Sequence, residues 1–369
     1  MRILVVNWQD LENPHAGGAE LHLFELFSRL ADQGHRVHLI CSGFPGGAPT
    51  ATVRGISVER HAGRHTFALA GRRAVRQALG RESWDVVVED INKLPLYLAA
   101  LTRLPFCAIV PHLFGTTAFR EASFPIAAMV ALAERPIPGV YRRAGFHAIS
   151  ESTRDDLVAR GVARDRIRVI HPGIDTAGFR PATGLDRAGS PAFLYVGRLK
   201  RYKGVEVALR ALARARRERG DLTLDVAGTG DDRPRLERLA ATLGISSVVR
   251  FHGFVDEDTR LRLFRAAWAN LFPSPKEGWG LTVMEAAACG TPSLASDSPG
   301  LRDSVRHGTT GFLVPHGEPE ALARRMLELS ADPALVARLG SAARRQAEAW
   351  TWQDAAAATE RHLSELIAG

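Results

Sequence analysis

A chain of 369 residues is longer than one hydrophobic core usually holds, so we expect two domains. Hydrophobic residues make up 46% of it and charged residues 24%, a composition that excludes a disordered, collagen-like or disulfide-rich protein. The net charge of +8 would suit an anionic partner, but the basic residues are spread along the chain without the aromatic interleaving of single-strand binders. We therefore expect no nucleic-acid partner.

The cysteines and the N-terminus indicate the compartment. Cys41, Cys107 and Cys289 are far apart and form no C-x-x-C pair, so neither a disulfide framework nor a cysteine zinc site is predicted. The apolar run that ends before Asn7 is too short for a signal peptide, and no run is long enough to span a membrane. These features favour a cytoplasmic protein, with peripheral contact at the inner face of an anionic membrane kept as an alternative.

Short apolar runs alternate with stretches of helical periodicity, a pattern typical of parallel sheets with crossover helices. Strands are predicted in the first half at residues 3–8, 37–41, 84–88, 107–110, 146–149 and 167–170, and helices at 21–31 and 153–160. In the second half, strands are predicted at 192–196, 222–227, 248–251, 269–272 and 293–295, and helices at 205–218, 234–243, 258–267, 281–288, 320–329 and 334–349. The pattern occurs twice, so we expect an α/β protein with two doubly wound, Rossmann-like domains.

Residues 181–191 lack periodicity and are rich in chain breakers, which places the linker there. The prediction is an N-terminal domain over 1–180, a C-terminal domain over 191–350, and a helix within 351–369 that could pack back on the N-terminal domain. Residues 54–81 hold seven arginines and one carboxylate, and a solvated surface is favoured there over an anion or membrane site.

Two loops that follow predicted strands could hold an anion. Gly17 and Gly18 stand between the first strand and the first helix, where glycines let a backbone approach a ligand at a helix N-terminus; a plain tight turn explains them equally well. The loop at 197–204 carries four cations, Arg198, Lys200, Arg201 and Lys203, at the end of a strand, where open α/β sheets bind ligands. A diphosphate site is favoured there over a solvated helix approach.

Glu277 and Glu285 flank the start of a predicted helix, with Gly278 and Gly280 between them. Carboxylates in such a position hydrogen-bond vicinal hydroxyls, and the loop N–H groups suit an oxygen ligand. An ordinary first-turn acid beside a flexible loop is an equally good interpretation from spacing alone.

The string EGWGLTVMEAAACGTP resembles the E-x7-E signature of family 4 glycosyltransferases, which are retaining enzymes of the GT-B fold. The segments GGAE (17–20), VGRLKRYKG (196–204), HGFV (252–255) and GTTGFLV (308–314) occur in the order that this family shows. The resemblance covers nearly the whole chain and implies two Rossmann-like domains that face a cleft.

The resemblance also implies roles for residues. Arg198 and Lys203 match the pair that neutralises the donor diphosphate, which is also the leaving group. Glu277 matches the residue that holds hydroxyls of the donor sugar, and Glu285 matches the acid that binds ribose. Other implied donor-binding residues are Gly17, Gly18, Gly253, Val255, Gly278, Trp279, Gly280 and Leu281.

A catalytic histidine is implied after the strand at 107–110, where relatives place one near the donor sugar. Relatives often have it one position earlier, where this sequence has Pro111, so either His112 takes the role or the role is absent; we favour His112. Glu89, Asp90 and Asn92 follow the neighbouring strand and could touch the acceptor, and a solvated loop is equally consistent with them.

No cofactor and no metal are expected, because Arg198 and Lys203 would supply the charge that a metal supplies elsewhere. Asp256-Glu257-Asp258 has the form D-x-D, but it opens a predicted helix, so capping is favoured over metal binding. The resulting prediction is a metal-independent, retaining hexosyltransferase with a UDP- or GDP-linked donor and a glycan, lipid-linked or small-molecule acceptor. The alternatives are a nucleotide-sugar epimerase or phosphorylase on the same fold, and a noncatalytic nucleotide-sugar binding module.

The acceptor side has one further candidate. Residues 114–143 are apolar and then basic, so they could form an acceptor pocket or touch an anionic membrane. A helix packed inside the first domain is the favoured interpretation.

Overall fold

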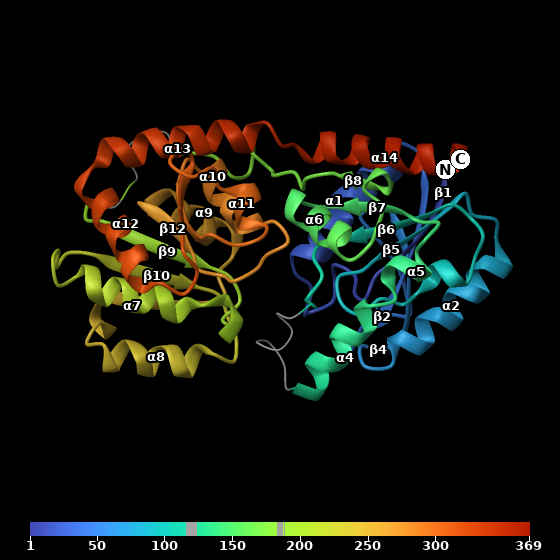
Figure 1. Ribbon diagram of the computed structural model, residues 1–369, viewed down its shortest axis with the longest axis horizontal. Coiled ribbons are helices and arrows are strands. Elements are labelled where there is room, and N and C mark those ends of the chain that lie inside the picture. The colour runs from blue at the N-terminus through green and yellow to red at the C-terminus, as the bar shows by residue number, and fades with distance from the viewer. Residues whose placement is uncertain (116–123, 183–186, 188) are drawn as a thin grey trace. The chain divides into compact units, whose positions relative to one another are not determined.

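The computed structural model describes residues 1–115, 124–182, 187 and 189–369, and it divides into two compact units (Figure 1). Unit 1 comprises Met1–Gly173 and Trp352–Gly369, and unit 2 comprises Ile174–Thr351. Each unit has its own mainly parallel sheet and its own core, in agreement with the two Rossmann-like domains that the sequence predicts.

Unit 1 contains an eight-stranded sheet in the order β3-β4-β2-β1-β5-β6-β7-β8. Its strands are β1 (Arg2–Val6), β2 (Arg36–Gly43), β3 (Thr50–Val53), β4 (Ile56–Gly63), β5 (Val86–Asp90), β6 (Phe106–Val110), β7 (Gly145–Ala148) and β8 (Ile167–Val169). Its helices are α1 (Gly18–Asp32), α2 (Phe67–Arg81), α4 (Phe124–Glu134), α5 (Ile137–Val140), α6 (Glu151–Ala159) and α14 (Trp352–Ala368), with short 3-10 turns at Leu98–Ala100 and Arg164–Arg166. Every position of β5 and β6 is buried, as expected for parallel strands that helices cover on both faces.

The hairpin of β3 and β4 was not predicted from the sequence. The two strands pair antiparallel through a two-residue turn, Arg54-Gly55, in which both residues have positive φ (46° and 79°). Such turns usually carry Asn-Gly or Asp-Gly, so an Arg-Gly pair inside an arginine-rich segment gave no hairpin signal.

The C-terminal helix α14 belongs to unit 1, where it packs against α1. Trp352, His362 and Leu363 are buried on its inner face. The first division between the units falls after Gly173 instead of in the predicted linker at 181–191. Residues 174–180 pack within unit 2, because Ile174 N–H donates to Trp350 O (3.0 Å) and Phe179 contacts Phe264. Residues 183–186 and 188 of that predicted linker lie outside the described residues.

Unit 2 contains a six-stranded parallel sheet in the order β11-β10-β9-β12-β13-β14. Its strands are β9 (Ala192–Val196), β10 (Thr223–Ala227), β11 (Val249–Gly253), β12 (Ala269–Phe272), β13 (Ser293–Ser296) and β14 (Gly311–Val314). Its helices are α7 (Val205–Ala215), α8 (Arg233–Thr242), α9 (Glu257–Ala266), α10 (Leu281–Ala288), α11 (Leu301–Ser304), α12 (Pro319–Ala331) and α13 (Pro333–Glu348), with 3-10 turns at Arg201–Lys203 and Ser246–Val248. In Figure 1 this sheet lies between α7 and α8 on one side and α10 and α13 on the other.

Both sheets have a topological switch point, where strand order reverses direction. In unit 1 the chain builds outward from β1 in one direction and from β5 in the other, and in unit 2 it does the same from β9 and β12. Open α/β sheets bind ligands outside the carboxyl ends of the strands at such points. The loops that follow β1, β5, β9 and β12 are therefore the places to look for a site.

Helix α4 corrects one prediction. The favoured interpretation was a helix packed inside the first domain, but Phe124, Ile126, Met129 and Leu132 are each more than half exposed. The part of the predicted apolar stretch at 116–123, including Phe119, lies outside the described residues. Within the described residues, no helix combines the length and the apolar character needed to cross a bilayer.

Candidate active site

The ends of β9 and β12 bring Lys203 and Glu277 together. The two strands are neighbours at the unit 2 switch point, and Lys203 Nζ lies 2.5 Å from Glu277 Oε1. Both side chains are largely buried, at 13% and 14% exposed. Lys203 also lies near the rings of Tyr202 and Phe272, at 5.1 and 5.8 Å from their centres. The expected phosphate-binding cation and the expected sugar-binding carboxylate thus form one ion pair.

Close backbone approaches fix the loops on which this pair stands. Gly204 has φ +69°, and a Cβ there would lie 2.5 Å from the carbonyl oxygen of Pro273, so no larger residue fits without a shift. Glu277 N–H donates to Pro299 O (3.1 Å), and a Cβ on Gly300 would lie 2.1 Å from Glu277 O. Sequence reasoning missed Gly300, whose signal was only the turn pattern Ser-Pro-Gly after β13.

Arg198 follows β9 with an exposed side chain, and among the described residues it takes part in no ion pair. Its carbonyl accepts a hydrogen bond from Tyr195 Oη (3.0 Å), which fixes the backbone beneath it. Of the other cations in the loop, Lys200 pairs with Asp231 at 2.9 Å. Arg198 therefore differs from Lys200 and Lys203, each of which is paired with an acid.

Glu285 lies on α10 and is buried. Its Oε1 is 3.3 Å from Arg260 Nη1, on α9, and its Oε2 is enclosed without a hydrogen-bond partner among the described residues. Burial raises the pKa of Glu285 to about 7, and the positive charge of Arg260 opposes that rise. Sequence reasoning missed Arg260, because its contact with Glu285 joins two helices that no local pattern relates.

Two residues of the predicted donor loop, Trp279 and Gly280, have structural roles. Gly280 has φ +91° and precedes the first residue of α10, Leu281, while the side chain of Trp279 is buried against Trp350, with ring centres 4.8 Å apart. Any contribution of Trp279 to a ligand would therefore come from its backbone. Gly278 is buried beside it.

The other predicted donor residues of unit 2, Gly253 and Val255, lie at and just after the end of β11. Gly253 has φ +73°, and its carbonyl accepts a hydrogen bond from Gly228 N–H (2.7 Å), whereas Val255 is half-buried. Asp256, the next residue, caps α9, because its carboxylate accepts from Thr259 N–H at 2.8 Å. Capping was the favoured interpretation of the D-x-D sequence and is confirmed. Over the ranges that the structure describes, no three His, Cys, Asp or Glu side chains are grouped to hold a metal ion.

In unit 1, Gly17 and Gly18 lie at the start of α1, after β1. Glu20 fixes this loop, since its Oε2 accepts the N–H of Gly17 at 2.8 Å. Its Oε1 lies 3.3 Å from Asn92 Nδ2 and 3.8 Å from Lys93 Nζ, in the loop after β5. The two loops of the unit 1 switch point are thus tied together through one carboxylate.

Glu89, Asp90 and Asn92 are buried, so the solvated-loop alternative is wrong. Glu89 has a structural role, because it accepts the N–H groups of Leu96 (2.6 Å) and Leu98 (3.0 Å). Asp90 differs, since both of its carboxylate oxygens lack a hydrogen-bond partner in the described part of the chain. Burial and the nearby charge of Glu20 raise the pKa of Asp90 well above its ordinary value.

His112 follows β6, the neighbour of β5 in the sheet. It is half-buried, and its ring meets that of Phe114 edge-on, with centres 4.9 Å apart. Thr153 Oγ1 donates to the carbonyl of Pro111 (2.9 Å), which holds the start of this loop. The position suits a ligand contact, and the catalytic role of His112 stays a prediction.

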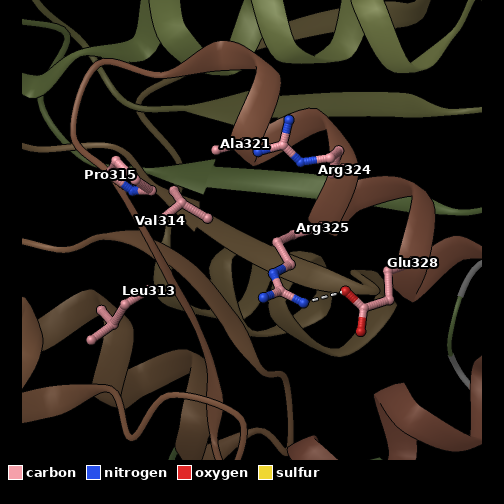
Figure 2. A pocket seen from close by; sticks show the side chains of 7 residues that line it. All are labelled: Leu313, Val314, Pro315, Ala321, Arg324, Arg325 and Glu328. Atoms are coloured by element: carbon pink, nitrogen blue, oxygen red, sulfur yellow. Dashed lines mark hydrogen bonds and ion pairs between the residues drawn. The ribbon is translucent and has the colours of Figure 1, made fainter.

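Two cavities of unit 2 lie away from these residues. One of about 350 Å³ is lined by residues of β14, by Pro315 after that strand, and by residues of α12 that include Arg325 and Glu328 (Figure 2). Arg325 pairs with Glu328 at 2.5 Å. A second, of about 400 Å³, lies between Phe179 and the first turn of α9. None of the predicted site residues lines either cavity, so the candidate site is defined by the loops at the switch points.

Two α/β units, each with charged loops at the switch point of its sheet, are the arrangement expected of a GT-B protein, and comparison with known proteins supports this class. Family models match most of the chain: "Glycosyltransferase Family 4" over residues 16–177 and "Glycosyl transferases group 1" over residues 182–346. Glycogen synthase of Mycobacterium tuberculosis is 30% identical over 97% of this chain and 93% of its own length. The chain belongs to the family 4, group 1 glycosyltransferases, which confirms the resemblance seen in its motifs.

The relatives whose names specify an acceptor are matched by this chain over a smaller part of their length. A D-inositol 3-phosphate glycosyltransferase of Streptomyces bingchenggensis is 37% identical over 68% of this chain, and the chain spans 59% of that relative. Among solved structures, sucrose-phosphate synthase of Thermosynechococcus elongatus superposes with a TM-score of 0.85 at 22% identity, covering 100% of this chain and 99% of the other. HepE of Anabaena, solved in complex with UDP-glucose, gives 0.80 at 21% identity, covering 99% of this chain and 100% of the other. These structures establish the fold.

Proposed function

We infer that this chain is a retaining, metal-independent glycosyltransferase that moves a hexose from a UDP- or GDP-linked donor to an acceptor hydroxyl. The observation that carries this proposal is the Lys203–Glu277 pair at the unit 2 switch point, with Arg198 on the same strand end. A diphosphate needs fixed cations and a sugar needs a carboxylate for its hydroxyls, and these residues supply both.

Each residue has a role in the proposed reaction. The bond between the anomeric carbon and the diphosphate oxygen breaks, and negative charge grows on that oxygen. Arg198 and Lys203 stabilise the leaving group more in the transition state than in the ground state, which is the condition for catalysis. Glu277 accepts hydroxyl hydrogens of the hexose and holds it in position, while Glu285 accepts those of the ribose.

The acceptor oxygen forms its bond on the face that the diphosphate leaves, so the configuration at the anomeric carbon is retained. The acceptor proton passes to the leaving phosphate oxygen, and no protein carboxylate has to act as a covalent nucleophile. A UDP-linked donor is supported by HepE, whose structure holds UDP-glucose, and by its similarity in fold to this chain. We leave GDP as the alternative.

Unit 1 supplies the proposed acceptor side. Asp90 carries two unpartnered oxygens at the end of β5, where a hydroxyl ligand could donate to them. His112 stands at the end of the adjacent strand. Glycan, lipid-linked and small-molecule acceptors all carry such hydroxyls, and the relatives named for D-inositol 3-phosphate make that compound the first small molecule to try.

Turnover tests this proposal. Purified protein with chelator would be given UDP- and GDP-hexoses and an acceptor panel that includes D-inositol 3-phosphate, and released nucleotide and product would be measured. Glycoside formation with the donor's anomeric configuration supports the proposal, and Glu277→Gln is expected to lose it. Tight nucleotide-sugar binding without any turnover would favour the noncatalytic binding module instead.

A further inference from the structure

Helix α4 has its polar and apolar sides reversed relative to an ordinary surface helix. A surface helix normally buries an apolar stripe and exposes charged residues. In α4 the only charged residue, Glu134, is 1% exposed, whereas Ile126, Met129 and Leu132 are 51%, 51% and 59% exposed. Phe124, at the start of the helix, is 75% exposed.

The orientation of α4 is fixed by its buried acid. Glu134 accepts the N–H groups of Phe114 (2.6 Å) and Gly115 (2.8 Å), and Arg160 Nη1 lies 3.1 Å from it. Ala127, two turns earlier on the same side, is fully buried. Rotating the helix to bury its apolar face would break these bonds and expose a paired carboxylate, so the outward position of the apolar side chains follows from the anchor.

The apolar face defined by Phe124, Ile126, Met129 and Leu132 is followed by cations. Arg135 is exposed directly after α4, and Arg142 and Arg143 are exposed after the short helix α5. Within the described residues, none of these three arginines has an ion-pair partner. Exposed apolar side chains beside unpaired cations match the chemistry of an anionic bilayer surface. At such a surface the apolar side chains enter the acyl boundary and the cations contact lipid phosphates.

We propose that the α4 face is the site through which unit 1 docks on an anionic membrane. Phe124, Ile126, Met129 and Leu132 enter the interface, and Arg135, Arg142 and Arg143 contact lipid phosphates. A second copy of this chain would be a poorer occupant of the same face, because two such surfaces would bring the same cations together. Docking of this kind deepens the proposed function, since it would deliver the enzyme to lipid-linked acceptors.

Vesicle sedimentation tests this docking without any need for transfer activity. The full chain would be mixed with phosphatidylcholine vesicles with and without phosphatidylglycerol, at low and high salt. We expect binding only to the anionic vesicles and weaker binding at high salt. The double variant Met129→Ser/Leu132→Ser should lower the partition coefficient by at least about tenfold, because each buried methylene contributes to insertion. Arg142→Gln/Arg143→Gln should weaken binding in the same assay.

Leu69→Ser is the matched control, because Leu69 is 81% exposed on α2, outside the α4 face. It should bind vesicles as the wild type does. Thermal unfolding should be unchanged in all variants, since the substituted side chains are exposed. Three outcomes would overturn the proposal. The first is equal binding to neutral and anionic vesicles, and the second is a loss of vesicle binding in Leu69→Ser as large as that in Met129→Ser/Leu132→Ser. The third is a wild-type dimer that does not bind vesicles and that Met129→Ser/Leu132→Ser converts to a monomer. Nucleotide binding and turnover, measured without lipid, report separately on the proposed function.

Discussion

Lys203 Nζ and Glu277 Oε1 are 2.5 Å apart, at the ends of two strands that are neighbours in the sheet although 74 residues separate them in the chain. Each group compensates the charge of the other in a largely buried position. The pair therefore holds a cation and a carboxylate ready for a diphosphate and a sugar, at the cost of burying both.

Lys203→Ala should lower turnover by roughly two to three orders of magnitude, as does loss of one donor that stabilises a developing oxyanion. Steady-state kinetics with a fixed acceptor would measure it. Glu277→Gln should lose a comparable amount, and the double variant Lys203→Ala/Glu277→Gln should lose less than the product of the two, because the residues are in contact. Full activity in Lys203→Ala would refute the phosphate site.

Glu285→Ala should weaken UDP binding by roughly 10- to 100-fold, because charge-assisted hydrogen bonds to the ribose would be lost. The pKa of Glu285 is about 7, so the wild-type affinity should rise as the pH increases through 7 and the carboxyl ionises. Calorimetric titration with UDP at several pH values measures both effects.

Arg260 should control that pH profile as a positioning residue. Its charge lowers the pKa of Glu285, so Arg260→Gln should move the rise in UDP affinity to higher pH. Glu285→Gln is the control, because it removes the titration of Glu285 and leaves that of the nucleotide and of the other protein groups. An unchanged profile in Arg260→Gln would mean that the pair has no part in binding.

Asp90→Asn should make unit 1 more stable while lowering transfer. Burial of an unpartnered carboxyl is unfavourable, and its raised pKa means that the folded state resists ionisation at neutral pH. Asparagine does not ionise in either state, so folding at neutral pH no longer requires protonation of this side chain, and the unfolding free energy should increase by about 1 kcal/mol or more. Transfer should fall with UDP binding unchanged. Lower stability with normal transfer would remove Asp90 from the acceptor side.

Unit 1 should lose stability in acid through its buried histidines. Burial lowers the pKa of His22 to about 4, so the unfolded chain, with a pKa near 6.5, binds a proton that the folded chain does not. The stability present above pH 6.5 should be lost as the pH falls toward 4, by about 3 kcal/mol for this residue. His147 and His362, from β7 and α14, are also buried with lowered pKa values.

Denaturant unfolding at pH 7 and pH 5 would check this loss. His22→Leu should reduce the difference between the two pH values, whereas His65→Asn, at an exposed histidine, should leave it unchanged. An equal response of both variants would contradict the assignment to His22.

The sequence predicted the central strands of both sheets and the loops that bring Lys203 and Glu277 together, because parallel strands place their following loops on one edge, but it missed β3, β4 and β14. Glycines, cations and acids in those loops were therefore recognisable before any contact was known. Arg260 and Gly300 could not be found in this way, since each acts through a contact between distant segments. The exposure of α4 was also missed, because an apolar helix normally packs inside, and only the buried anchor Glu134 reveals which side faces outward.

Arg198 and Lys203 form the proposed donor diphosphate site, which works without a metal. It is tested most directly by thermal unfolding of the wild type and Lys203→Ala with UDP, GDP and their hexose conjugates in the presence of a chelator. We expect a rise in the unfolding temperature of the wild type with one nucleotide family, and a much smaller rise in Lys203→Ala. A metal-dependent shift, or an equal shift in both proteins, would contradict it.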